Sequence, residues 1–347
     1  MKKYIVLLMI ILGAFSLQAK EEVVSESFDT QNIDAVKITS KFGRVKVESW
    51  AKNEIAVTAI IRVSSNKEEA AEKILSNVSV DMDRKGNYIN VETTFEMFFS
   101  FMKFTNNLFR NGDFSIDYEV KMPQNIILDI TLDNGDIVLY ERNGNVKISH
   151  SNGSISSQSI GGTAKMKLRS SKLKISNVDS LLVDAKNSDI FLTKSRYINA
   201  KSYNTSFEID EVKLLETNSL RDTFSVGDIA DISATSSLSS FSFGTLKNFA
   251  VMDTSYGNFS VERVGAKFDE IKLTCKGTDV SIGLGATPAS IAINHHVSTK
   301  LDIPDNFGLN MKFGKDRKYL ITTGTVGAAK NNNELLVNIK GGSLQLR

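Results

Sequence analysis

The stretch that decides the fold repeats one short phrase, in Thr205-Ser-Phe-Glu-Ile209, Asp222-Thr-Phe-Ser-Val226, Ser239-Ser-Phe-Ser-Phe243 and Gly257-Asn-Phe-Ser-Val261. Each copy has a small or turn-forming residue, an apolar residue two positions later and another apolar residue two positions after that. Side chains two positions apart point to the same face of a β-strand. The phrase therefore predicts a short strand that buries one face.

The phrase continues on both sides of this stretch, from Ile127 to Leu284. Its apolar pairs are Ile137/Leu139, Ile155/Ser157, Leu173/Ile175, Ile190/Leu192, Phe207/Ile209, Phe224/Val226, Phe241/Phe243, Phe259/Val261 and Val280/Ile282, with one lapse at Ser157. Successive pairs are 17 or 18 residues apart, except for a last interval of 21. A fixed period is typical of arrays whose units bury an apolar face only by stacking. It predicts an all-β, single-stranded β-solenoid with about 17–18 residues per coil, of a handedness that the residues do not define.

Two other folds fit the pattern less well. A left-handed hexapeptide helix needs an aliphatic residue at every sixth position, but the sixth steps from Ile137 fall on Asn143 and Ser149. An antiparallel sandwich or barrel would show strands every 8–12 residues without one locked period.

Residues 1–19 are predicted to be a secretory signal peptide. Lys2 and Lys3 precede an apolar run, and a small residue, Ala19, ends the segment. The chain has 42 basic and 40 acidic residues, so cleavage after Ala19 removes two lysines and leaves 40 of each. This neutral balance argues against nucleic acid or anionic lipid as the main partner. We expect an exported protein with no transmembrane segment after cleavage, in the periplasm, on the outer cell surface or secreted.

Residues 20–125 are predicted to contain strands, one short helix and an aromatic insertion that together cap the solenoid. Ser65 or Asn66 can cap the helix, whose buried stripe is Ala70, Ala71, Ile74 and Leu75. The insertion, Phe95 to Phe109, either folds over the solenoid or exposes an apolar loop to a partner. The candidate partner contacts in it are Phe98, Phe99, Phe101, Met102 and Phe104.

The remaining chain is predicted to form the regular solenoid over residues 126–290 and strands that close its far end over residues 291–347. In the last segment, Leu335 to Ile339, a Lys-Gly-Gly turn and Leu344/Leu346 predict a final hairpin.

Four sequence segments together resemble the bacterial putative-adhesin family, whose domain has no assigned function. They are Phe42-Gly-Arg-Val-Lys-Val-Glu-Ser-Trp50, Lys121-Met-Pro123, Leu132-Asp-Asn-Gly-Asp-Ile137 and Ser151-Asn-Gly-Ser-Ile155. The resemblance extends from about Val36 to Leu346 and implies an exported cell-envelope β-solenoid. Its motifs are structural turns, and this chain departs from them where Ser, Thr or Asp replaces Gly after Gly153 and in the aromatic insertion.

The ionisable residues do not predict a catalytic, cofactor or metal site. The corner acids Asp136, Asp189, Asp222 and Asp279 alternate with Ser, Lys and Asn in other coils, so they form no acidic ladder and are typical turn formers. The three histidines are His150, predicted to plug a coil corner, and the adjacent His295 and His296, predicted to lie on opposite strand faces. Cys275 is the single cysteine and is predicted to be a buried structural thiol.

These observations predict a non-enzymatic, exported cell-envelope protein that binds or scaffolds, with an envelope protein or a glycan as its unidentified partner. Corners rich in Ser, Asn and Thr suit a polar or glycan-like partner. Two alternatives remain open: a carbohydrate-active β-helix enzyme, and a periplasmic protein that binds a partner through the Phe-rich segment.

Overall fold

The computed structural model describes residues 18–65, 68–95, 114–315, 317–327 and 333–347. Strands make up 78% of it and helices 3%, which confirms the predicted all-β solenoid-like fold. The strands are β1 (Gln18–Asp29), β2 (Ala35–Ser49), β3 (Glu54–Ser65), β4 (Val78–Lys85), β5 (Tyr88–Phe95), β6 (Phe114–Met122), β7 (Ile127–Leu139), β8 (Val146–Lys186), β9 (Asp189–Tyr203), β10 (Ser206–Leu220), β11 (Thr223–Ser237), β12 (Ser240–Ser255), β13 (Asn258–Val264), β14 (Glu270–Ile282), β15 (Ala289–His296), β16 (Lys300–Asp302), β17 (Asn310–Phe313), β18 (Tyr319–Val326) and β19 (Glu334–Leu346). The helices are α1 (Glu68–Leu75) and the 3-10 helix η1 (Asp305–Phe307).

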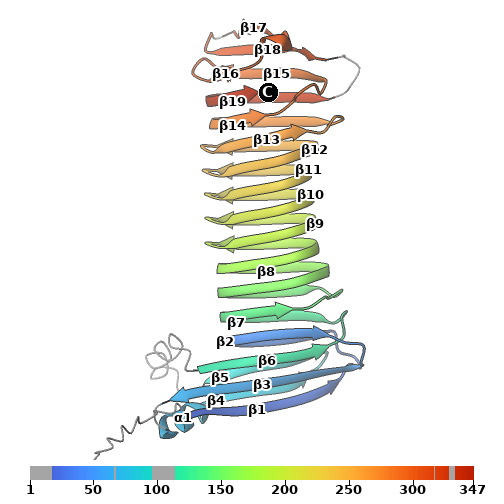
Figure 1. Cartoon of the computed structure of the whole chain (residues 1–347), viewed down its shortest axis with the longest axis vertical. Helices are drawn as coiled ribbons and strands as arrows, with labels where there is room; N and C mark the ends of the chain where they lie inside the picture. The colour runs from blue at the N-terminus through green and yellow to red at the C-terminus, as the bar shows by residue number, and fades with distance from the viewer. Residues whose placement is uncertain (1–17, 66–67, 96–113, 316, 328–332) are drawn as a thin grey trace, which may run out of the picture.

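The parallel stack that runs from β2 through β7 to β14 is the body of the molecule (Figure 1). Equivalent residues of successive coils pair directly, so that Phe207 lies beside Phe224 and Phe224 beside Phe241. Every residue of the nine pairs in the phrase is buried, and even the lapse at Ser157 is only 8% exposed. Residues separated by one period of the sequence therefore pair with each other in neighbouring coils of the stack.

From Asn152 onward, each coil of the array turns at a corner where a residue with left-handed backbone precedes the small residue of the phrase. The corner residues with positive φ include Asn187, Asn204, Arg221 and Leu238, at 50° to 60°. A Cβ added to Gly153 would lie 1.9 Å from the carbonyl oxygen of Gly135 in the neighbouring coil, so no side chain fits there without a shift. Where Ser or Thr replaces this glycine, the side chain is buried and its hydroxyl donates to the carbonyl two residues earlier, as in Ser171, Ser188, Thr205, Ser239 and Thr278.

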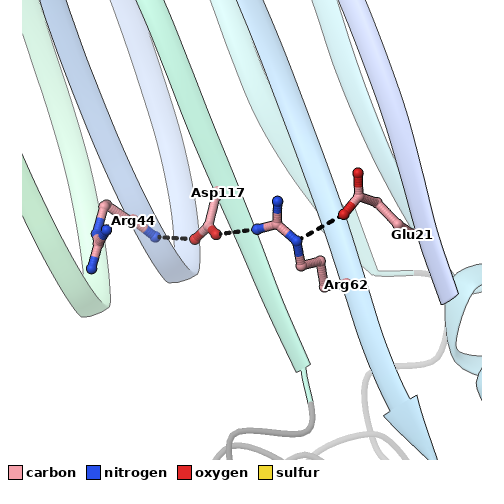
Figure 2. Close-up of polar contacts among 4 residues, drawn as sticks. All are labelled: Glu21, Arg44, Arg62 and Asp117. Atoms are coloured by element: carbon pink, nitrogen blue, oxygen red, sulfur yellow. Dashed lines mark hydrogen bonds and ion pairs between the residues drawn. The ribbon is translucent and has the colours of Figure 1, made fainter. Parts of the chain in front are cut away.

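The N-terminal end of the stack is an antiparallel layer. β1 pairs with β3, β3 pairs with β6, and β4 and β5 form a hairpin, while β5 and β6 both pair in parallel with β2. Figure 2 shows one polar chain that ties this layer together: the Arg62 guanidinium donates to Glu21 at 2.9 Å and to Asp117 at 2.7 Å, and Asp117 accepts from the Arg44 amide at 3.0 Å. Because these residues come from β1, β3, β6 and β2, the contacts hold four strands in register.

The predicted helix is present as α1, beside this layer. Of its predicted apolar stripe, Ala71 and Ile74 are buried and Leu75 is half-buried against the core. No helix in the described ranges is long and apolar enough to cross a membrane.

At the other end of the stack, the chain does not follow sequence order. β19 pairs in parallel with β14 along both of its straight halves, and β15 pairs with the opposite edge of β19. The predicted final hairpin is therefore wrong, because the Gly341-Gly342 turn is a coil corner with both φ angles near 74° rather than a strand reversal. Beyond β15, the antiparallel strands β18 and β17 end the stack.

Candidate functional site

One lateral face of the stack carries two outward rows of uncharged polar side chains. Both rows alternate with buried apolar pairs. One row runs from β10 to β13 and is followed by Asp279 in β14, and the other runs from β11 to β14 and is preceded by Glu208 in β10. The register places each residue of a row beside its counterpart in the next coil. We call this surface the hydroxyl strip; its residues are Ser206, Thr223, Ser225, Ser240, Ser242, Asn258, Ser260 and Ser281, each exposed or half-buried. Neighbouring coils lie about 4.8 Å apart, so the strip presents hydroxyl and amide groups at that repeat.

Towards the N-terminal end, the same face becomes aromatic and charged. A depression of about 210 Å³ is lined by Lys174, Phe191, Glu208 and neighbouring residues. A second depression, of about 300 Å³, includes Tyr140, whose side chain is 41% exposed. Lys174 borders both, so the depressions are neighbours along the face.

The ring environments in this region favour a polar ligand with apolar faces. The Lys172 ammonium lies 5.0 Å from the centre of the Phe191 ring, and the Lys46 ammonium lies 5.6 Å from that of Tyr140. A half-exposed aromatic ring beside hydroxyl and charged groups offers one surface for C–H groups and another for hydrogen bonds. The volumes of the two depressions lie below or at the lower end of the range of pockets that enclose a drug-sized ligand.

The corner acids predicted as turn formers lie apart from one another. Asp136 accepts from the Ser154 amide at 3.0 Å and hydroxyl at 2.6 Å, and Asp279 accepts from the Ser343 hydroxyl at 2.7 Å. Asp222 is buried inside a corner, whereas Asp189 is exposed. Within the described ranges no three His, Cys, Asp or Glu side chains gather in a way that could hold a metal ion.

His150 fills a coil corner, as its position in the sequence predicts. Its Nδ1 lies 2.8 Å from the Ser171 hydroxyl and its Nε2 lies 3.0 Å from the Gly135 carbonyl oxygen. Burial lowers the pKa of the imidazole, more than the Gly135 carbonyl and the nearby carboxylates raise it. The histidine therefore joins three coils and is structural.

The remaining two histidines and the single cysteine also lie in positions that are typical of structural residues. His295 is buried and His296 is half-buried, which confirms that these adjacent residues face opposite sides of β15. Cys275 is buried, and desolvation raises the pKa of its thiol to about 12. A thiol with such a pKa stays protonated at neutral pH and is a poor nucleophile.

The five predicted partner contacts, Phe98, Phe99, Phe101, Met102 and Phe104, lie outside the described residues. The sequence also predicted polar corners as the binding surface, but it did not single out the hydroxyl strip. The signal for it is the residue between the apolar pair, which is Ser in four successive phrases after Glu208 (Ser225, Ser242, Ser260 and Ser281).

The chain matches no protein-family model and no curated protein. Its structure was compared with solved structures, and one similar chain is that of a putative cell adhesion protein from Clostridium sporogenes. The two share 10% sequence identity, with 95% of this chain and 100% of the other covered, at a TM-score of 0.20. This likeness is too slight to transfer fold or function.

Proposed function

We propose that this protein is an exported, non-enzymatic β-solenoid of the bacterial cell envelope that binds glycan along its hydroxyl strip and the adjoining aromatic depressions. The observation that carries the proposal is a pair of polar rows, each of which continues over four adjacent strands in constant register. A flat, regular array suits a polymer with repeating hydroxyl groups. Each hydrogen bond contributes only about 0.5–1.5 kcal/mol, but many such contacts on one chain act together.

The test is retention of the purified protein on insoluble glycans, including peptidoglycan sacculi, cellulose and chitin. The variant Ser225→Arg/Ser242→Arg places two long cations in one row of the strip and should weaken retention about tenfold or more, since loss of about 1.4 kcal/mol is tenfold. The matched control is Asn218→Arg/Thr235→Arg, which adds the same charge to exposed positions of β10 and β11 outside the strip. Equal retention of the two variants, or no retention of the unaltered protein on any glycan, would reject the proposal.

The aromatic depressions make a second, separable contribution. Tyr140→Ala and Phe191→Ala remove the two rings while leaving the hydroxyl strip intact, so both should lower retention without abolishing it. Leu238→Ala, which removes a comparably exposed apolar side chain at a corner, serves as the control.

The predicted signal peptide at residues 1–19 supports export. The cellular location of the exported protein distinguishes adhesion at the surface from scaffolding in the periplasm. Protease treatment of intact cells should remove the protein if it is displayed on the surface, in favour of adhesion. Protection until the outer envelope is opened would favour periplasmic scaffolding. N-terminal sequencing of the exported form should begin at Lys20 if cleavage follows Ala19.

A carbohydrate-active enzyme is the second candidate, and one observation favours it. Glu208 and Asp210 both line the depression beside Phe191, where a bound sugar would lie. Hydrolysis needs two carboxyl groups that flank the scissile bond. Release of reducing ends from a glycan, lost in Glu208→Gln, would establish this activity in place of simple binding.

A further inference from the structure

The C-terminal end of the stack exposes an unpaired strand edge. β17 lies at the end of the molecule in Figure 1 and pairs only with β18 among the described strands. All four of its residues are exposed, and its apolar members Met311 and Phe313 are 56% and 64% exposed. Val297, in the neighbouring turn, is 52% exposed. An edge of this kind is a template for pairing with another strand.

The N-terminal end has a matching edge. β1 lies at the opposite end of the stack and pairs only with β3 within the part of the chain that is described (Figure 1). Val23 on this strand is 54% exposed. Glu21 is held by Arg62, but Glu22 and Glu26 are exposed and make no ion pair with any described residue.

The two edges carry opposite charge. The side chains of β1 are Lys20 against Glu21, Glu22, Glu26 and Asp29, a net charge of −3, and the edge stays acidic when cleavage after Ala19 adds an α-ammonium group at Lys20. The sequence from Asn310, where β17 begins, to Lys318 has Lys312, Lys315, Arg317 and Lys318 against Asp316, a net charge of +3. Two copies therefore repel when like ends meet and attract when unlike ends meet.

We propose that the protein associates end to end, with β17 of one copy against β1 of the next. The occupant of each edge is a second copy of this chain, because it brings the complementary charge, an unpaired backbone edge and an apolar side chain. Such a contact uses different surfaces on the two partners, so it leaves a free end of each kind and extends into open filaments. Glycan-binding strips would then align along a filament, although the association does not depend on glycan binding.

Sedimentation velocity and light scattering of the purified protein over a range of concentrations test the association. We expect a weight-average mass that rises with concentration at low ionic strength. The rise should diminish as salt increases from about 0.01 M to about 1 M, which shortens the Debye length from about 30 Å to about 3 Å. A monomer at every concentration and salt level would overturn the proposal.

Charge reversal identifies the surfaces. Lys312→Glu/Lys315→Glu alone and Glu22→Lys/Glu26→Lys alone should each abolish the concentration-dependent rise in mass. The chain that carries all four reversals should regain it, because its ends are complementary again. Lys165→Glu/Lys167→Glu makes the same charge change on an exposed lateral part of β8 and should associate like the unaltered protein. Association that survives the single-end reversals, or that the lateral reversal abolishes, would mean that another surface is used and would contradict the proposal.

The circular dichroism spectrum and unfolding midpoint of every variant must match those of the unaltered protein before the masses are compared. For a variant that fails to match, the apolar change Met311→Ser/Phe313→Ser replaces the reversal at the C-terminal end. It keeps the charge but removes two exposed side chains, and we expect it to weaken association at all salt concentrations. Unchanged association in this variant would contradict the contact at β17.

Discussion

Asp222 shows how a single corner residue can make the stability of the stack depend on pH. Its carboxylate accepts from the Ser202 hydroxyl at 2.7 Å, the Thr205 amide at 2.8 Å and the Leu220 amide at 3.1 Å. These bonds lower the pKa of the carboxyl, but desolvation is the larger effect and raises it above the usual value. The folded protein thus binds the Asp222 proton more tightly than the unfolded chain does.

The sign of the pH dependence follows from that difference. A raised folded pKa gives a stabilising contribution that is complete below the unfolded pKa of about 3.9 and is lost as pH rises through the folded pKa. We expect the free energy of unfolding of the unaltered protein, relative to Asp222→Ser, to fall as pH rises above about 3.9, because the folded pKa lies above that unfolded value. Urea unfolding at several pH values measures it, with exposed Asp189→Ser as control. A difference that is constant with pH, or that rises, would contradict this prediction.

Arg142 is a buried cation without a carboxylate partner in the described part of the chain. Its side chain is fully buried; Nη2 donates to the Ile126 carbonyl at 2.5 Å, while Nε and Nη1 have no hydrogen-bond partner there. Desolvation lowers its pKa to about 10, so the guanidinium is still charged at neutral pH. An uncompensated buried charge opposes folding.

Replacing this charge with an apolar side chain of similar length should therefore stabilise the protein. We expect Arg142→Met to raise the free energy of unfolding by about 1–4 kcal/mol. Arg196→Met is the matched control: Arg196 forms an exposed pair with Asp179 at 2.7 Å, and loss of such a pair changes stability by about 1 kcal/mol or less. Denaturant unfolding compares the two variants; a less stable Arg142→Met protein would show that its single hydrogen bond outweighs the buried charge.

At the scale of the strand, three phenylalanines of successive coils form a stacked ladder inside the core. The Phe224 ring is stacked between Phe207, at 4.3 Å between ring centres, and Phe241, at 4.7 Å, each within 5° of parallel. Phe224→Ala would leave a cavity between two rigid coils and should lower the free energy of unfolding by about 3–5 kcal/mol. The half-buried outward residue Phe191 provides the control, because Phe191→Ala creates no internal cavity. Thermal and urea unfolding should separate the two, and similar losses would contradict the inward and outward assignment.

The strands and their inward residues could be predicted because one feature of the sequence determines both. Side chains of a strand alternate between its two faces, and the strand recurs every 17 or 18 residues in the stacked coils. Pairs such as Phe224/Val226 therefore indicate both which side chains are buried and which residues of neighbouring coils lie side by side. The hydroxyl strip could not be predicted as a site. Outward Ser225 and Ser242 are equally what any solvent-exposed strand face carries, and only the structure places them in one row.

At the scale of the whole molecule, the coils are stacked in the order of the chain only within the uninterrupted series of repeats. Within the array, each coil contacts the next one along the chain. Past Ile282 the phrase ends, and nothing in the spacing indicates that Leu335 and Leu344 return to pair beside β14. Which segment pairs with β14 depends on which apolar strand best covers the open edge of that strand, and this is decided by tertiary packing.

If stability in the array is set by contacts between neighbouring coils, one complete coil can be removed. Deleting residues 206–222 joins Thr205 to Thr223, and Thr223 already pairs with Ser206 as Ser206 pairs with Asp189. Since the register of β9 against β11 would equal that of β9 against β10, we expect a folded protein with an unchanged strand spectrum and one cooperative unfolding transition.

Deleting part of a coil should have the opposite result. Removal of residues 206–214 would place Glu216 and Asn218 where Phe207 and Ile209 point inward, and a charge buried in that core has no partner. We expect this shorter deletion to lose the strand spectrum and to aggregate, although it removes fewer residues. Circular dichroism and size-exclusion chromatography of the two deletions decide the matter. If the complete-coil deletion were as unfolded as the partial one, the coils would not be interchangeable, and stability would depend on contacts beyond the nearest neighbour.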